Sequence, residues 1–160
     1  KWSDRLNLVN DSIQNFTANS KGHLFDIVIS NPPFYEGDLK SPDANNDTAA
    51  HSTELPWTSL VENVSSLLTD AGSFFVLVPT LRAYTMQKLA EAQQLQLVEE
   101  VLVYNDAKHL PFRSFLHFKK NSNTLDKAIS VLRNKIVIKN TDNTYSTEFT
   151  ALLKDYYLHL

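Results

Sequence analysis

The sequence contains no cysteine, and this absence excludes several kinds of chemistry. A protein without cysteine has no disulfide framework, no thiolate nucleophile and no zinc site built on thiolates. The sequence also lacks any apolar run that approaches the roughly 20 residues needed to cross a bilayer. Both absences favour a cytoplasmic protein. The five histidines are scattered and show no ligand spacing with carboxylates, so we expect no metal site.

Glycine is also scarce, with three residues among 160. Gly22, Gly37 and Gly72 stand far apart, and none belongs to the glycine-rich turn with which an adenosyl- or dinucleotide-binding sheet normally opens. Neither sign of charge predominates, because the formal net charge is only −3. The chain therefore has no global electrostatic footprint for nucleic acid, and an RNA partner would depend on local basic patches.

The sequence does contain an alternation of strand and helix patterns, on a chain long enough for one domain with a real core. Apolar and alternating runs predict six strands, at 6–10, 27–29, 74–78, 97–104, 113–118 and 135–139. Apolar residues at helical spacing predict helices at 56–70, 81–92 and 149–157. This order predicts an α/β sheet.

The most informative stretch is residues 26–34, which read Asp-Ile-Val-Ile-Ser-Asn-Pro-Pro-Phe. The β-branched run is typical of a buried parallel strand. The two prolines fix φ and remove backbone donors, so the strand must stop at Asn31. Asn31 precedes a proline and is held extended. The result is a stiff tip at the carboxyl end of a strand, the place where ligands bind in open α/β sheets.

The residue types at this tip suit the handling of a planar amino group. The Asn31 side-chain oxygen and the Pro32 carbonyl can both accept hydrogen bonds from an NH₂ group. Phe34 can stack on a base that has been taken out of its helix. Such positioning can lower a barrier without an acid or a base. The structural alternative is a loop in which Pro-Pro merely ends the strand and Phe34 packs in the core.

An Asn-Pro-Pro-Phe tip resembles the motif of the S-adenosylmethionine-dependent methyltransferases that modify exocyclic or amide nitrogens. The resemblance implies a Rossmann-like class I methyltransferase sheet with helices on both faces. It implies S-adenosylmethionine as the cofactor, Asn31, Pro32 and Phe34 as the catalytic tip, and Asn31 near the cofactor. It further implies substrate contacts by Pro33, with Tyr35 and Arg113 as additional candidates.

Flanking segments narrow the resemblance. Residues 48–52 and 55–57, together with 145–150 and 156–157, are similar to bacterial enzymes that methylate N6 of the adenosine beside the anticodon of valine tRNA. Three alternatives remain open. They are methylation of a release-factor glutamine, another RNA or DNA amino-methyltransferase, and a non-catalytic binding module with the same fold.

The resemblance also implies that part of the methyltransferase sheet is missing. In the family the glycine-rich and acidic strands come first, and residues 6–10 resemble the third strand, which places Asp11 at the adenine of the cofactor. Asp11 and Asn31 would then lie three strand spacings apart, roughly 14 Å. We therefore expect residues 1–160 to be the C-terminal part of a single methyltransferase domain that alone binds the cofactor poorly. We expect a displaced segment, a partner chain or self-association to cover the exposed edge.

A modest basic region occupies the second half of the chain, and we interpret it first as a solvated face. The alternative is contact with a tRNA backbone, to which Arg82 and Arg113 would add charge from strand ends. The basic residues concerned are Lys119, Lys120, Lys127, Arg133, Lys135 and Lys139.

Overall fold

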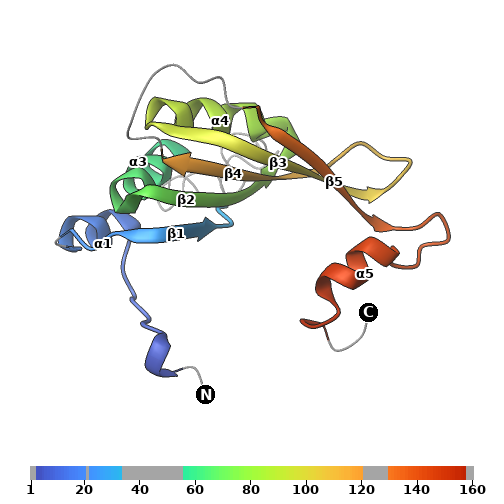
Figure 1. The fold of residues 1–160 in the computed structure, drawn as a ribbon, viewed down its shortest axis with the longest axis horizontal. Helices are drawn as coiled ribbons and strands as arrows, with labels where there is room; N and C mark the ends of the chain where they lie inside the picture. The colour runs from blue at the N-terminus through green and yellow to red at the C-terminus, as the bar shows by residue number, and fades with distance from the viewer. Residues whose placement is uncertain (1–2, 21, 34–55, 121–129, 158–160) are drawn as a thin grey trace, which may run out of the picture.

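The computed structural model describes residues 3–20, 22–33, 56–120 and 130–157 (Figure 1). Its helical elements are η1 (Ser3–Arg5), α1 (Ile13–Asn19), α3 (Trp57–Leu67), η2 (Thr80–Arg82), α4 (Ala83–Ala92) and α5 (Thr147–Leu153). Its strands are β1 (Phe25–Ser30), β2 (Leu68–Pro79), β3 (Leu95–Asp106), β4 (Arg113–Lys120) and β5 (Leu132–Lys139).

These strands form one sheet in the order β1-β2-β4-β3-β5 (Figure 1). β1 runs parallel to β2, and β3 runs parallel to β5, while β4 is antiparallel to both of its neighbours. β1, β2, β3 and β5 therefore all end at the same edge of the sheet, which we call the carboxyl edge. β4 begins at the carboxyl edge and ends at the opposite, amino edge. This mixed sheet confirms the predicted α/β fold.

The core lies between the sheet and helices α3 and α4. Burial alternates along β2, where Phe74, Val76 and Val78 are buried against the helices. Each such side chain contributes about 1.5–3 kcal/mol when it is fully buried. The remaining members of the core cluster come from both helices, β2, β3 and β4, and they are Trp57, Leu60, Val61, Val64, Leu68, Met86, Ala90, Leu95, Leu97, Leu116 and Phe118.

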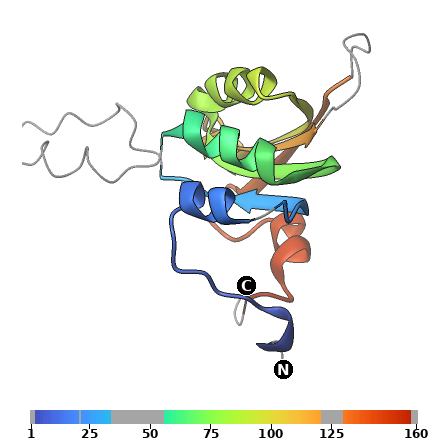
Figure 2. The ribbon, with the colours of Figure 1, turned by 90° about the vertical axis from the view of Figure 1, so that its left-hand side faces the viewer.

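Helices α3 and α4 cover the same face of the sheet (Figure 2). The physical reason is the handedness of the crossovers, because β1, β2 and β3 progress in one direction across the sheet and right-handed connections then fall on one side. In the described part of the chain the other face is open over β1, β2 and β4, where Ile27, Ile29 and Phe115 are exposed. The sequence predicts helices on both faces of the sheet. In the described part of the chain the helices cover one face, and α5 packs beside the outer strand β5.

The predicted strand at 6–10 does not form. These residues adopt no regular secondary structure, and all of them are exposed. A strand satisfies its backbone groups through a neighbour, and none of the described residues pairs with this segment. The next residues, by contrast, start helix α1, where Asp11 Oδ1 accepts hydrogen bonds from the Ser12 amide at 2.8 Å and from Asn15 Nδ2 at 2.9 Å. Within the described ranges, no helix is long and apolar enough to cross a membrane.

Candidate active site

The predicted tip is present at the carboxyl edge. β1 ends at Ser30, whose last partner in the register is Val76 of β2. Immediately beyond it the Asn31 side chain is exposed, Pro32 is buried and Pro33 is exposed. The buried proline anchors the turn to the body of the domain, so the amide of Asn31 is presented to solvent from a fixed backbone. Phe34 and Tyr35 lie outside the described residues.

The first residue of α3 braces this tip from the side. The Trp57 indole N–H donates a hydrogen bond to the Pro33 carbonyl oxygen at 3.3 Å. Trp57 is only 1% exposed, and Pro56 stands at the N-cap of its helix, a position that suits a residue without an amide hydrogen. Pro33 itself has no amide hydrogen, so this contact through its carbonyl ties the second proline to the core.

A cation lies over the same indole. The Arg82 guanidinium carbon is 5.3 Å from the centroid of the Trp57 ring, within the range of a cation–π interaction. Arg82 ends η2, the short turn that follows β2. The carboxyl ends of β1 and β2 are thus joined through Pro33, Trp57 and Arg82. The sequence identified Arg82 as a strand-end cation, and it placed Trp57 in a helix and in the segment at 55–57. It did not indicate the contact between Trp57 and Pro33, because a contact across 24 residues leaves no local signal.

Arg113, the predicted substrate contact, opens β4 at the same edge and lies opposite Pro79 in the register. Its guanidinium carbon lies 5.4 Å from the centroid of the Phe112 ring, and its Nη1 donates to the Phe112 carbonyl at 3.0 Å. β4 is two positions from β1 in the sheet, which is roughly 10 Å at the usual strand spacing. The structure therefore brings Arg113 to the edge that carries Asn31.

The two lysines at the end of β4 lie elsewhere. Lys119, the second-last residue of β4, pairs with Ser73 of β2 and with Gln96 near the beginning of β3, and so lies toward the amino edge. The Lys120 ammonium donates to the carbonyls of Ser65 at 2.8 Å and Leu68 at 3.0 Å, which satisfies the free carbonyl groups at the end of α3. These lysines do not share an edge with Asn31, so they do not extend the site. Lys127 and residues 48–55 lie outside the described residues.

The comparisons with known proteins agree with this geometry. No protein-family model matches the chain. A solved structure of a predicted O-methyltransferase from Agrobacterium tumefaciens superposes with a TM-score of 0.59 at 12% identity, over 84% of this chain and 52% of that one. The chain thus has the α/β, Rossmann-like fold of the class I methyltransferases.

Two curated relatives make the relationship more specific. A tRNA1(Val) (adenine(37)-N6)-methyltransferase of Pseudoalteromonas atlantica is 30% identical over 99% of this chain, which spans 65% of that protein. A protein of the same name from Bacteroides thetaiotaomicron is 27% identical over 99% of the chain, which spans 63% of its length. The chain is therefore a homologue of the tRNA1(Val) (adenine(37)-N6)-methyltransferases, and the resemblance seen in its sequence is confirmed.

Proposed function

We propose that the protein transfers a methyl group from S-adenosylmethionine to N6 of an adenine in tRNA, next to the anticodon of valine tRNA. The observation that carries the proposal is the Asn31-Pro32-Pro33 tip, anchored by buried Pro32 and held by Trp57 at the carboxyl edge. The names of its homologues support the same reaction. A tRNA substrate also supports a cytoplasmic location.

The tip would act by orienting the acceptor. The Asn31 side-chain oxygen and the Pro32 carbonyl would accept the two N–H bonds of the adenine amino group and aim its lone pair outward. Phe34 would stack on the flipped base, with Pro33 and Tyr35 at its border. S-adenosylmethionine, when bound, supplies the electrophilic methyl group. The Asn31 oxygen and the Pro32 carbonyl would hold the amino nitrogen that receives this group, and one of its two protons would leave to solvent.

The cofactor side of the site is only partly built by the described residues. Asn31 would face the methyl group and Asp11 the adenine of the cofactor, but Asp11 is exposed and its carboxylate is engaged at the start of α1. The outer edge of β1 is unpaired within the described ranges, and Ile29 there is 77% exposed. We infer that residues 1–160 form the acceptor part of one methyltransferase domain. Further strands would add to β1 and complete the cofactor site, with self-association as the other way to cover this edge.

The test uses the full-length protein and valine tRNA with labelled S-adenosylmethionine. Asn31→Ala should lower methyl transfer by about 100-fold or more, since misplacing a reacting group has effects of that size. Binding of S-adenosylmethionine, measured by calorimetry, should be unchanged. Asn134→Ala, which removes an exposed amide from the outer strand β5, is the matched control and should transfer normally.

Each outcome separates the alternatives. Mass spectrometry should find N6-methyladenine in the tRNA. Near-normal turnover by the Asn31 variant would refute the role of the tip, and transfer to a release-factor glutamine instead of tRNA would assign the rival activity. Methyl transfer to neither would leave a binding module. Tight, stoichiometric binding of S-adenosylmethionine by residues 1–160 alone would contradict the inference that the cofactor site needs further strands.

A further inference from the structure

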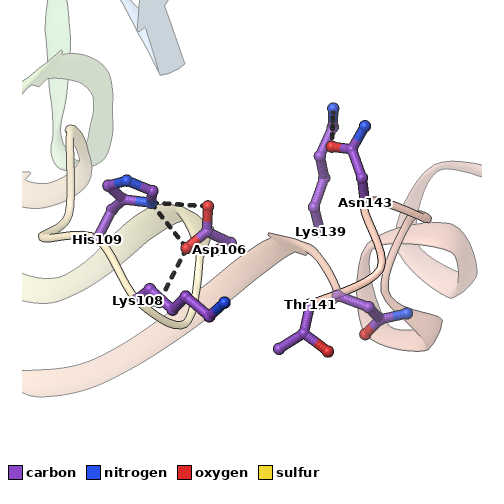
Figure 3. A pocket seen from close by; sticks show the side chains of 7 residues that line it. Asp106, Lys108, His109, Lys139, Thr141 and Asn143 are labelled. Carbon is purple, nitrogen blue, oxygen red and sulfur yellow. Dashed lines mark hydrogen bonds and ion pairs between the residues drawn. The ribbon is translucent and has the colours of Figure 1, made fainter.

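A cavity of about 190 Å³ lies at the carboxyl ends of β3 and β5 (Figure 3). These are the two strands farthest from β1, which leads to Asn31. One wall is the turn after β3, with Asp106, Lys108 and His109. The other wall is the turn after β5, with Lys139, Thr141 and Asn143. Because β3 and β5 are parallel neighbours, their two turns stand side by side. None of the residues that line this cavity has been assigned a role at the Asn31 tip.

Among the described residues that line the cavity, Asp106 supplies the one carboxylate, and it holds its own turn. Asp106 Oδ1 accepts a hydrogen bond from the Lys108 amide at 2.8 Å, and Asp106 Oδ2 lies 2.7 Å from His109 Nδ1. The Lys108 amide and, after it, the His109 ring lower the pKa of Asp106, so this carboxylate stays ionised and bound within the turn. The contact through Nδ1 leaves His109 Nε2 directed away from Asp106.

The second wall is a short, hydrogen-bonded turn. The Asn140 amide donates to the Thr144 carbonyl at 2.9 Å, and Asn143 adopts a φ of 68°, which asparagine tolerates better than most residues. The Lys139 ammonium donates to Asn143 Oδ1 at 2.8 Å, so its position is fixed by the turn. One ammonium has three donors, so Lys139 can still bind a second acceptor.

The charges around the cavity favour an anion. Lys108 and Lys139 line the cavity together with one carboxylate, Asp106, which already has its own partners. The Asp142 carboxylate, in the same turn as Thr141, is held by the amide and the hydroxyl of Thr144. Among the described residues neither lysine belongs to an ion pair. The Thr141 hydroxyl and the His109 ring add polar groups to the same lining. A group with several acceptor oxygens and a negative charge, such as a phosphate, matches this set of donors.

The position of the cavity relative to Asn31 favours a phosphate group of a polyanion over a free phosphate ion. β3 and β5 lie three and four positions from β1, so the cavity is displaced across the sheet from Asn31 by roughly 14 to 19 Å at the usual strand spacing. It is also displaced along the strands, because Asp106 and Lys139 lie three residues beyond the level of the Val103–Arg113 pair, which adds roughly 10 Å. Arg82 and Arg113 lie between these two points on the same edge. A free phosphate ion would contact only one of these basic positions, whereas a polyanion can contact all of them along the carboxyl edge.

We propose that the Lys108–Lys139 cavity binds a backbone phosphate of the RNA whose adenine is presented to Asn31. The cavity anchors the RNA at a distance from the reacting base, and Arg82 and Arg113 carry the backbone between the two points. The inference rests on the proposed tRNA methyltransferase activity, since it names how the same substrate is held. Phosphate contacts of this kind position a nucleic acid and account for most of its salt-dependent affinity.

The test compares two double variants of the full-length protein, Lys108→Gln/Lys139→Gln and the control Lys119→Gln/Lys135→Gln. Both remove two positive charges, but the control lysines are exposed and lie at the amino edge and within β5. Binding of valine tRNA is measured by fluorescence anisotropy over a range of salt concentrations. For the cavity variant we expect affinity to fall by about tenfold or more at moderate salt, and the log–log salt slope to decrease by about 1, the value for one lost phosphate contact. The control should change neither.

Kinetics separate an anchoring role from damage to the fold. The cavity variant should raise the KM for tRNA and leave kcat at saturating tRNA unchanged. The single variant Lys108→Gln should give about half the change in salt slope. It also guards against a disturbed turn, because Lys108 holds Asp106 through its backbone amide, which the substitution keeps.

The outcomes distinguish this inference from the proposed function. If the wild-type protein binds and methylates tRNA but the cavity variants keep its slope and KM, the inference is overturned and the function stands. If the wild type neither binds nor methylates tRNA, the proposed function fails, and an RNA phosphate in this cavity is excluded with it. If NMR shows that inorganic phosphate binds the cavity while tRNA affinity is unchanged in the variants, the ligand is free phosphate and the inference is wrong.

Discussion

The two edges of the sheet hold the two ends of the same helix, but with different consequences. At the carboxyl edge the first residue of α3, Trp57, donates to the Pro33 carbonyl and so braces the Asn31 tip. At the amino edge Lys120 donates to the carbonyls of Ser65 and Leu68, where α3 ends. The first contact fixes a site, and the second closes a helix end. A polar contact to a helix terminus therefore says nothing about function until its edge of the sheet is known.

The lysines follow the same division. Lys120 is half-buried and serves the fold, whereas Lys108 and Lys139 line a cavity at the carboxyl edge. Lys120 follows Arg113 closely in sequence, yet the two residues lie at opposite edges because β4 spans the whole sheet. Its eight residues extend over roughly 26 Å. Basic residues that look like one region in the sequence are thus split between two ends of the molecule.

Among the substitutions that test this difference between the two edges, we expect the one at Trp57 to have the largest effect. Trp57→Phe keeps most of the buried ring but removes the hydrogen bond to the Pro33 carbonyl, so the tip loses its brace. We expect a loss of about 1 kcal/mol in the free energy of unfolding and a fall in kcat of about tenfold or more. Urea denaturation and methyl transfer to valine tRNA measure the two quantities.

Phe118→Leu is the matched control for this prediction. Phe118 is fully buried and stacks on Phe74 with centroids 5.9 Å apart, but it belongs to the part of β4 near the amino edge. This variant should lose about 1 kcal/mol or more of stability and keep the kcat of the folded protein. Equal losses of kcat in both variants would show that Trp57 acts through general stability and not through the tip.

The next effect, at Lys120, concerns stability alone. Lys120→Met keeps an unbranched side chain but removes both hydrogen bonds to the end of α3, so the free energy of unfolding should fall by about 1–2 kcal/mol. Lys119→Met, at an exposed neighbour on the same strand, should change it by less than about 0.5 kcal/mol. Neither substitution should alter the salt slope of tRNA binding. A reduced slope in either variant would show that RNA also contacts the amino edge, which would contradict the division of roles between the two edges.

The smallest effect concerns pH and His117, on the open face of β4. Burial, aided by the charge of Lys119 and opposed by that of Glu99, lowers the pKa of His117 below its ordinary value of 6.5. The ring stacks on Phe75 with centroids 4.2 Å apart. The folded state thus favours the neutral ring, and this contribution to stability is present above pH 6.5 and is lost as the pH falls through the folded pKa.

Denaturation as a function of pH checks this prediction. His117→Gln should flatten the loss of stability between neutral and mildly acidic pH. NMR titration should place the midpoint of His117 below the ordinary value of 6.5. A midpoint at or above the ordinary value would contradict burial as the dominant influence on the His117 ring.

Much of the fold could be predicted from local patterns, although the observed helices and strands begin and end at other residues than predicted. The apolar run at 74–78 lies within β2, and the helical spacing that begins at Trp57 matches α3. Gly72 stands two residues after the predicted helix at 56–70, a usual position for a helix stop, but it lies inside β2. A Cβ there would come within 2.9 Å of both the Leu68 side chain and the Thr69 carbonyl. Its role is a close backbone approach, which a sequence pattern does not distinguish from a helix stop.

The site divides in the same way between local and long-range information. Asn31, Pro32 and Pro33 could be predicted because strand propensity and the prolines act on neighbouring residues. Arg113 could be predicted only as a strand end. The brace by Trp57 and the cavity of Lys108 and Lys139 could not be predicted, because each joins elements that are many residues apart.

The sequence by itself determined the chemical identity of the tip, since a β-branched strand that meets Asn-Pro-Pro must stop and present its amide. Only the tertiary structure decided which cations accompany that amide. The parallel strands bring Arg82, Lys108 and Lys139 to the edge of Asn31, and the reversal of β4 carries Lys119 and Lys120 to the other edge. The physical reason is that strand direction is fixed by pairing with neighbours across the sheet. This pairing is a long-range property that no local stretch of the chain encodes.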